Sequence, residues 1–246
     1  MTSIENSFTI LSSVDSTNNY AMARVHEGLA KHGDAFFAVE QTAGKGQRGK
    51  NWQAAEGQNI VLSVVAEPFQ LKTHQQFSFS IAVALACYDF FNGYAGDETK
   101  IKWPNDIYWR DRKAGGVLIE NINRGNSWNW SVIGVGVNVN QTVFEASLKN
   151  PVSLRQITGK EHNVIALAKE LQASIIRRLE ELHSSGVSTL LTEYNQHLFR
   201  MNELVKLRKD NLVYETKIMG VNVEGKLLTR DAFDREIGFE SVEWVL

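Results

Sequence analysis

Apolar residues change their spacing along the chain, and these changes predict the order of its elements. Short, nearly continuous apolar runs rich in β-branched side chains are typical of buried strands. Such runs predict strands at residues 8–11, 35–39, 59–65, 100–103, 116–120 and 130–137. Apolar positions that recur every three or four residues predict helices after Ser16, around 77–88, after Asn163 and around 190–198. Because strands and helices do not alternate strictly, we expect an α+β fold in which helices pack on a mixed β-sheet.

The pattern changes again after about residue 201. Short apolar segments separated by turns predict strands at 204–207, 213–219, 226–229 and 236–244. These strands favour a small C-terminal antiparallel β-barrel. We therefore expect two domains, a larger one at residues 1–200 and the barrel at 201–246.

The composition excludes several classes of protein. Of the 246 residues, 43% are apolar and 22% are charged, which is typical of a globular chain and not of a disordered one. The net charge of −2 argues against a protein built as a whole to bind nucleic acid. The one cysteine, Cys87, lies in an apolar run and is expected to be a buried structural thiol.

The N-terminal residues 1–6 carry neither the basic nor the apolar part of a signal peptide. Apolar runs end well before the 18 residues that a membrane span requires. We therefore expect a cytoplasmic protein with no membrane partner and no nucleic-acid partner.

A glycine-rich basic segment separates the strands expected at 35–39 and 59–65. Residues 44–49 spell G-x-G-x-x-G, but a dinucleotide-binding loop opens a helix, whereas this one leads into another strand. Its main-chain N–H groups can approach an anion, and Lys45, Arg48 and Lys50 add positive charge with no acid nearby. Trp52 offers a flat surface on which a purine can stack. The alternative is an ordinary solvated basic turn beside a buried tryptophan.

A second group of polar residues follows the strand at 100–103. Pro104 ends that strand, so Asn105 and Asp106 are expected at a turn that faces a cleft. A carboxylate there suits Mg²⁺, which is commonly held by one or two carboxylates together with substrate phosphates. Ordinary turn chemistry is the alternative. Lys113 precedes two glycines, which would let a ligand come close to the backbone.

The segment 134–138 reads Gly-Val-Gly-Val-Asn at the end of an expected strand. Glycine inside a strand often marks the close approach of a ligand or of another backbone. Asn138 is then a candidate to reach a nucleotide.

Together and in this order, these motifs resemble the catalytic core of the biotin–protein ligase family. The resemblance rests on five segments, at residues 15–18, 41–52, 102–106, 113–120 and 134–138. The segment Lys-Trp-Pro-Asn-Asp at 102–106 is the most specific of them. The β-rich tail resembles the small C-terminal domain of that family more loosely.

The resemblance implies a role for each matched residue. Biotin would be bound by Ser16, Thr17, Asn18, Gln41, Lys45, Gly46, Gln47, Lys113 and Gly115. ATP would be bound by Lys45, Arg48, Lys50, Trp52, Asn105 and Asn138. The catalytic residues would be Lys113, Asp106 and Arg48, with Asp106 beside the metal ion.

The activity implied by the resemblance is a two-step, ATP- and Mg²⁺-dependent biotinylation. Biotin would first become biotinyl-5′-AMP and then pass to a lysine of a biotin carboxyl carrier domain of a carboxylase. The alternatives are a lipoate–protein ligase-like enzyme and a non-catalytic biotin-binding regulator. The regulator remains an alternative because this chain has Gln47 at a position where the family commonly has an arginine. The motifs begin at Asp15, so we expect no N-terminal DNA-binding domain; the chain is expected to be a monomer or a homodimer formed through a strand edge.

Overall fold

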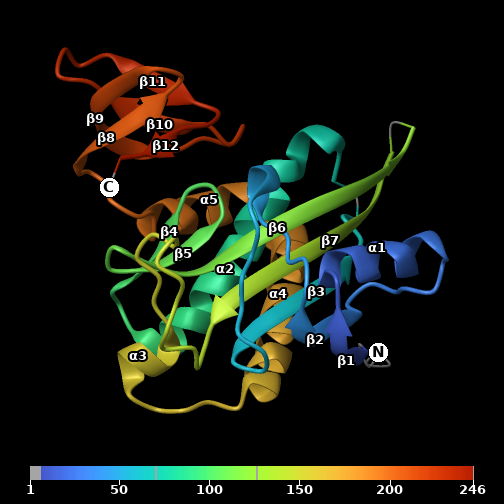
Figure 1. The fold of residues 1–246 in the computed structure, drawn as a ribbon. Coiled ribbons are helices and arrows are strands. Elements are labelled where there is room, and N and C mark those ends of the chain that lie inside the picture. The colour runs from blue at the N-terminus through green and yellow to red at the C-terminus, as the bar shows by residue number, and fades with distance from the viewer. Residues whose placement is uncertain (1–6, 70, 126, 246) are drawn as a thin grey trace.

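A seven-stranded mixed sheet lies at the centre of the computed structural model, which describes residues 7–69, 71–125 and 127–245 (Figure 1). The strand order is β1-β2-β3-β7-β6-β5-β4, and only β1 and β2 among these neighbours pair in parallel. The strands are β1 (Phe8–Val14), β2 (Ala35–Gln41), β3 (Asn59–Ala66), β4 (Thr99–Lys102), β5 (Asp106–Trp109), β6 (Arg112–Arg124) and β7 (Ser127–Asn138).

Helices cover the two faces of this sheet unequally. On one face lie the long helices α2 (Gln76–Ala95) and α4 (Val164–Ser185), and the inward side chains of β3 and β7 join them in the main core. On the other face the short helix α1 (Thr17–His26) buries Ala21 and Val25 against the sheet. α1 covers only part of its face, so the remainder is available to the loops that carry polar residues.

Two helices begin where the sequence predicts, α1 after Ser16 and α4 after Asn163, whereas the helix expected around 190–198 begins at Val187. Asn163 caps α4, and its side chain accepts a hydrogen bond from the backbone N–H of Ala166 at 3.0 Å. The buried positions of α4 recur every three or four residues, which places one apolar stripe against α2. Cys87 is buried within α2, and burial raises the pKa of its thiol to about 12, as suits a structural thiol.

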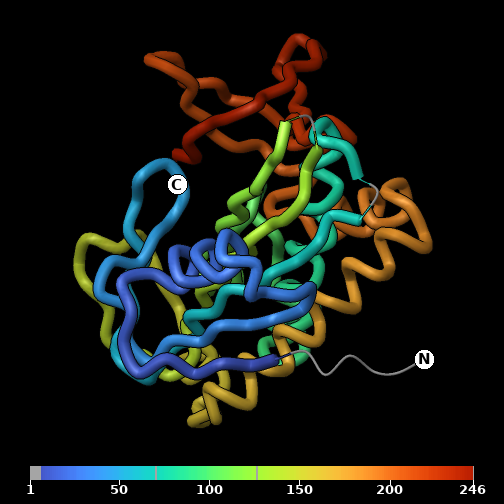
Figure 2. The backbone as a smooth tube through the Cα atoms, turned by 90° about the vertical axis from the view of Figure 1, so that its right-hand side faces the viewer, coloured from blue at the N-terminus to red at the C-terminus, as the bar shows by residue number. Residues whose placement is uncertain are grey.

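The C-terminal strands form a second, five-stranded antiparallel sheet with the order β11-β10-β9-β8-β12. Its strands are β8 (Leu204–Lys209), β9 (Leu212–Val221), β10 (Leu227–Arg230), β11 (Glu236–Phe239) and β12 (Glu243–Trp244). The indole of Trp103 donates to the carbonyl of Gly225 at 3.0 Å, and Asn195 of α5 (Val187–Gln196) exchanges two hydrogen bonds with Val221. These contacts attach the second sheet to the first domain above the β4–β5 hairpin (Figures 1 and 2).

The expected fold class is confirmed, and the structure adds elements that the pattern did not reveal. The helix α3 (Leu154–Thr158) and the strand β5 were not predicted, and the strand expected at 236–244 is two short strands. The sequence predicts a turn at Asp106, but the structure places Asp106 at the first position of β5. The turn spans residues 103–105, and the chain then reverses at once, so Asp106 pairs with Lys102. None of the helices in the described ranges is both long and apolar enough to cross a membrane.

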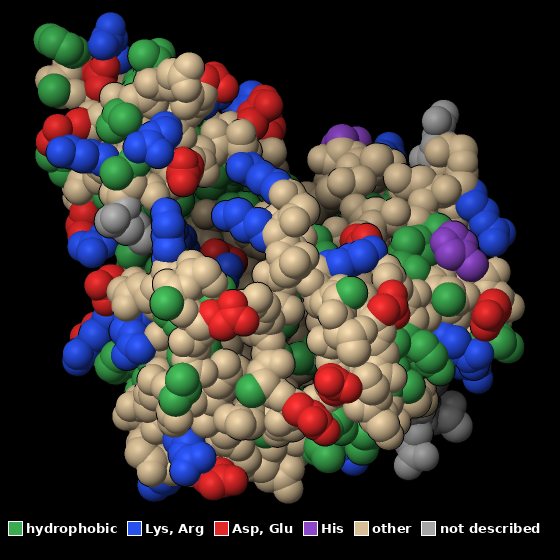
Figure 3. All heavy atoms as spheres, viewed as in Figure 1, with side chains coloured by type: hydrophobic (Ala, Val, Ile, Leu, Met, Phe, Trp, Pro, Cys, Tyr) green, Lys and Arg blue, Asp and Glu red, His purple; other side chains and the backbone are tan. Residues whose placement is uncertain are grey.

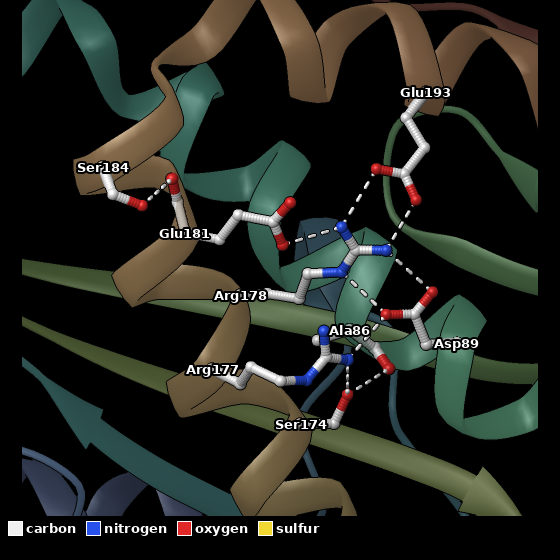
Figure 4. A network of polar contacts seen from close by, with 8 residues as sticks. All are labelled: Ala86, Asp89, Ser174, Arg177, Arg178, Glu181, Ser184 and Glu193. Atoms are coloured by element: carbon white, nitrogen blue, oxygen red, sulfur yellow. Dashed lines mark hydrogen bonds and ion pairs between the residues drawn. The ribbon is translucent and has the colours of Figure 1, made fainter.

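A buried arginine joins three helices behind the sheet (Figure 4). Arg178 of α4 donates to both carboxylate oxygens of Asp89 on α2, at 2.7 and 2.9 Å, and to both of Glu193 on α5, at 2.6 and 2.9 Å. It also donates to Glu181 on its own helix at 2.9 Å. These charged partners raise the pKa of Arg178.

Arg178→Met is expected to lower the free energy of unfolding by about 2–4 kcal/mol, because three carboxylates lose their shared cation. Arg177→Met is the matched control: Arg177 also contacts Asp89, but its side chain is 58% exposed, so a loss below about 1 kcal/mol is expected. Urea unfolding of both variants measures the difference. Equal losses in the free energy of unfolding would show that the buried Arg178 stabilises the fold no more than the exposed Arg177.

Candidate active site

The face of the sheet beyond α1 carries a row of paired positions that crosses five strands. Val61 of β3 pairs with Gly136 of β7, and Gly136 pairs with Gly116 of β6. Gly116 pairs with Asp106 of β5, and Asp106 pairs with Lys102 of β4. Directly paired residues project to the same side of a sheet. After Val61, the row therefore has two glycines without side chains, then the carboxylate of Asp106 and then the amine of Lys102.

The glycines of β7 make room for residues that come from elsewhere in the chain. A Cβ added at Gly134 would lie 2.3 Å from Oδ1 of Asn18. Asn18 is only 3% exposed, and it donates to Glu120 at 2.7 Å and accepts from the hydroxyl of Ser63 at 2.6 Å. A side chain at Gly134 would displace this polar floor, so the close approach requires glycine.

Trp52 occupies the second opening, over Gly136. A Cβ at Gly136 would lie 2.2 Å from Cε2 of the indole. The loop that brings Trp52 there folds back on itself, with a backbone hydrogen bond of 2.9 Å from Trp52 to the carbonyl of Gly44 and an antiparallel bridge between Lys45 and Asn51. The indole N–H of Trp52 is buried and has no acceptor among the described residues.

The tip of the same loop exposes its cations. Arg48 adopts a left-handed backbone conformation (φ 56°) inside the short turn Gln47–Gly49. Lys45, Arg48 and Lys50 are all exposed, and Figure 2 shows the loop rising from the sheet. Figure 3 shows a hollow on this face, with Lys and Arg side chains gathered around it.

The carboxylate of the row is ion-paired with the expected lysine. Nζ of Lys113 lies 2.6 Å from Oδ1 of Asp106, and both groups lie over Gly116. The backbone of Lys113 also holds the loop after β7, through hydrogen bonds of 2.9 Å with Asn150 and Val152. The amide of Asn138 donates to the carbonyl of Val152 at 3.1 Å and so supports the same loop.

The two basic segments therefore lie on one face of the sheet, in agreement with the roles that the family resemblance implies for Lys45 and Lys113. Nζ of Lys45 lies 3.9 Å from Oε1 of Glu120, on the same strand, β6, that carries Lys113. Glu120 in turn accepts the hydrogen bond from Asn18. The loop at 44–50 and the segment 102–113 are thus joined through the floor of the site.

Several expected ligand-binding residues already hold other parts of the protein. Ser16 is buried at the start of α1, and Thr17 donates from its backbone N–H and its hydroxyl to Gln41, at 2.8 and 3.2 Å. The amide of Asn105 donates to the carbonyl of Val117. A Cβ at Gly115 would collide with the backbone of Gly136 (2.9 Å), so Gly115 serves strand packing. Direct contacts of these residues with a ligand stay predictions.

The expected ligand-binding residues of the loop, Lys45, Gly46, Gln47, Arg48 and Lys50, are all exposed or half-buried, and Lys45 also contacts Glu120. Sequence reasoning missed Ser63 and Glu120, which hold Asn18. A serine inside the apolar run 59–66 was a usable signal for the first. Lys102 was also missed, although its motif was identified.

Lys102 is the most unusual titratable group of the site. It is 7% exposed, and burial is the main reason that its pKa falls to about 8; Lys113, Lys149 and Lys50 lower the pKa further, while Asp106 raises it. Three lysines from separate segments of the chain thus act on the ammonium of Lys102.

The residues of this face can supply one carboxylate to a metal ion. The described residues contain no group of three or more His, Cys, Asp or Glu side chains that could hold a metal ion on their own. Oδ1 of Asp106 is bound by Lys113, and its side chain is 24% exposed. This fits a Mg²⁺ ion whose other ligands are water and substrate phosphates, and it does not fit an ion held by protein alone.

Gly136→Ala is expected to expel Trp52 and to lower the free energy of unfolding by about 1–3 kcal/mol, because the added methyl group overpacks the site. The freed loop should also be cut faster by trypsin after Lys45, Arg48 or Lys50. Gly93→Ala in α2 is the control, since a Cβ there meets nothing within 4 Å and should stabilise the helix by about 0.5–1 kcal/mol. Unchanged stability and cleavage in Gly136→Ala would contradict the packing described.

Lys102→Met is expected to raise the free energy of unfolding at pH 7 by about 1–2 kcal/mol, since it removes a buried charge but also loses cation–π contacts. The pKa of this amine is about 8 in the folded chain against 10.5 ordinarily. Between these values the folded chain binds fewer protons than the unfolded one, so wild-type stability gains with rising pH. The difference in free energy of unfolding between the variant and wild type should therefore shrink from pH 8 to pH 10. Urea unfolding across this range measures the difference. A difference that grows with pH would contradict the prediction.

Known proteins are similar to this chain in sequence and in fold. The family model described as "Biotin/lipoate A/B protein ligase family" matches residues 10–138. The bifunctional ligase/repressor BirA of Escherichia coli (strain K12) is 29% identical over 221 residues, which are 88% of this chain and 65% of that protein. This chain therefore spans less than two thirds of that relative.

Other relatives match along nearly their whole length. The biotin--[acetyl-CoA-carboxylase] ligase of Paracoccus denitrificans is 27% identical over 235 residues, 93% of this chain and 96% of that protein. The structure of the biotin protein ligase from Aquifex aeolicus in complex with biotin and ATP has a TM-score of 0.81 at 23% identity, covering 98% of this chain and 100% of that one, which shows a shared fold. Because the family model matches more than half of the 246 residues, this chain belongs to the biotin/lipoate A/B protein ligase family.

Proposed function

We propose that this protein is an ATP-dependent biotin–protein ligase, which forms biotinyl-5′-AMP and transfers biotin to a lysine of a biotin carboxyl carrier domain. The observation that carries the proposal is the meeting, on one sheet face, of the cationic loop, the indole over Gly136 and the Lys113–Asp106 pair. The relatives support it, since the Paracoccus protein is named a biotin ligase and the Aquifex structure holds biotin and ATP. The division into domains at residues 1–200 and 201–246 belongs to the same proposal.

In the first step, the site would have to bring two anions together, the carboxylate of biotin and the α-phosphate of ATP. The biotin ring system would lie over the polar floor made by Asn18, Ser63 and Thr17, and the adenine would lie against Trp52. The biotin carboxylate and the α-phosphate of ATP would then meet near Lys113. Its ammonium offsets the repulsion between them, and the exposed cations of the loop add to the positive field.

In the first step a carboxylate oxygen of biotin forms a bond to the α-phosphorus of ATP. The bond from that phosphorus to the bridging oxygen breaks, and its electron pair leaves with pyrophosphate. The protein contributes position and charge, and it needs no covalent nucleophile. Asp106 would hold a Mg²⁺ ion, which would supply further charge neutralisation.

In the second step the amine of an acceptor lysine forms an amide with the biotinyl carbonyl carbon, and AMP leaves with the electron pair of the broken C–O bond. The attacking amine must lose a proton, and Asp106 is the carboxylate at the site that can accept it. Closure of the loop at 44–52 would keep water from hydrolysing the adenylate. Arg48, at the tip of this loop, would reach the phosphate from above.

Lipoate is the rival substrate, because the matching family model includes lipoate ligases. Mass spectrometry of a carrier domain incubated with this protein, MgATP and equal concentrations of biotin and lipoate tests the proposal. A mass increase that matches biotin is expected. Lipoylation would favour the rival enzyme, and an unmodified carrier despite biotin binding would favour a regulator that binds biotin without catalysis.

Lys113→Ala is expected to lower biotin-dependent exchange of pyrophosphate into ATP by about 100-fold or more, because the transition-state charge loses its cation (about 3 kcal/mol). Lys209→Ala, at an exposed position of β8, is the control and should exchange at the wild-type rate. Exchange within a few fold of wild type in Lys113→Ala would remove this residue from the catalytic step.

A further inference from the structure

One carboxylate, that of Glu120, contacts both the polar floor of the site and the cationic loop. Its Oε2 accepts a hydrogen bond from the amide of Asn18 at 2.7 Å, and its Oε1 lies 3.9 Å from Nζ of Lys45. Glu120 lies on β6 two positions after the partner of Gly134, the glycine that Asn18 covers. Because side chains two positions apart on a strand share a face, Glu120 belongs to the same face as the floor.

The two contacts of Glu120 differ in strength. The side chain of Lys45 is 43% exposed, and an ion pair at 3.9 Å in contact with solvent contributes little. Asn18 is 3% exposed, and a hydrogen bond from a buried amide to a charged acceptor is among the stronger ones in proteins. Glu120 therefore acts mainly on the floor, through Asn18, and only weakly on the loop.

A carboxylate only accepts hydrogen bonds, so Glu120 fixes which end of the Asn18 amide faces it. The NH₂ group must point to Glu120, and the carbonyl of Leu118, 3.5 Å away, is too distant to hold that group by itself. Oδ1 of Asn18 then needs a donor, which is the hydroxyl of Ser63 at 2.6 Å. Ser63 has one proton to give, yet its oxygen also lies 2.8 Å from the hydroxyl oxygen of Thr17. Since that proton goes to Asn18, Thr17 must donate to Ser63.

The contacts of Thr17 with Gln41 agree with this order of protons. The backbone N–H of Thr17 donates to Oε1 of Gln41 at 2.8 Å, whereas the hydroxyl lies 3.2 Å from the same oxygen. The longer contact is the one expected to weaken when the hydroxyl proton is used elsewhere. Nε2 of Gln41 in turn lies against Gly44, where an added Cβ would collide with it. The carboxylate of Glu120 thus sets donors and acceptors through three buried residues, as far as the base of the loop.

We propose that Glu120 is a positioning residue that sets the ligand specificity of the floor. Its carboxylate fixes which atoms of Asn18, Ser63 and Thr17 donate and which accept. The floor then selects a ring whose own donors and acceptors match this order, as the ureido ring of biotin has both. An amide at position 120 would donate as well as accept, so Asn18 could turn over and the order of protons could reverse. The inference rests on the proposed ligase function and deepens it.

The test compares Glu120→Gln with wild type in the full-length chain, because glutamine keeps the size of the side chain and removes its restriction to accepting. We expect the Kd for biotin, measured by calorimetry, and the KM for biotin in pyrophosphate exchange to rise by about 10-fold or more. The KM for ATP should change by less than about 2-fold, because the hydrogen bonds that begin at Glu120 reach neither Trp52 nor Lys113.

Ser63→Ala tests whether Glu120 acts through the floor. Loss of this hydroxyl interrupts the order of protons between Asn18 and Thr17, so biotin binding should weaken while the KM for ATP stays unchanged. In the double variant Glu120→Gln/Ser63→Ala the two effects should overlap, and the Kd for biotin should rise by less than the product of the two separate increases. Should Glu120→Gln not fold, the split between biotin and ATP in Ser63→Ala alone decides the matter.

Glu170→Gln is the matched control. Glu170 on α4 also accepts one short hydrogen bond, from the hydroxyl of Tyr94 at 2.6 Å, but α4 covers the opposite face of the sheet. This variant loses the same charge by the same isosteric change. It should match wild type in its affinities for biotin and for ATP.

The outcomes separate this inference from the function on which it rests. A wild-type protein that does not exchange pyrophosphate in the presence of biotin would overturn the ligase proposal and this inference together. Wild-type exchange with an unchanged Kd for biotin in Glu120→Gln would overturn this inference alone. Equal losses of biotin and ATP affinity would show that Glu120 is merely structural, and independent effects in the double variant would show that it does not act through Ser63; either result would also overturn the inference.

Discussion

The absence of side chains at three positions of the central strands makes the rest of the site possible. Gly134 admits Asn18, Gly136 admits Trp52, and Gly116 lies beneath the Lys113–Asp106 pair. Asn18 and Trp52 come from segments far away in the chain, so the two glycines of β7 determine which segments meet on this face. A methyl group at either position of β7 would lie within 2.3 Å of an intruding side chain, a distance that no rotamer relieves without displacing that side chain.

Electrostatics then sets the character of the face that the glycines open. One carboxylate, Asp106, stands among lysines from the loop, from β4, from β6 and from the segment after β7. Such an excess of cations costs free energy in the folded chain, most of all at the buried Lys102. The cost is understandable if a polyanion completes the charge balance, and a nucleotide triphosphate has this chemistry.

The two sheets are connected at this face by side-chain contacts and not only by the chain. The Trp103 indole reaches Gly225, Asn195 is bound to Val221, and Trp244 lies over Lys102. Lys102, which lies at this junction, pairs with Asp106 in the row of the active-site face. The junction between the two sheets therefore lies beside the Lys113–Asp106 pair.

The sequence by itself determined the order of most elements, the separate β-rich C-terminal part and the identity of the polar motifs, because apolar periodicity and glycine placement are local properties. It did not reveal α3 or β5. It also indicated that the segments at 44–50 and 102–113 belong to one site. Tertiary structure decided how they meet: Asp106 begins a strand instead of lying in a turn, Asn105 and Asn138 support backbone, and Ser63 and Glu120 complete the floor. Lys102 shows the reason most clearly, since its burial depends on Trp244, 142 positions later in the chain, and no local pattern encodes a contact across that separation.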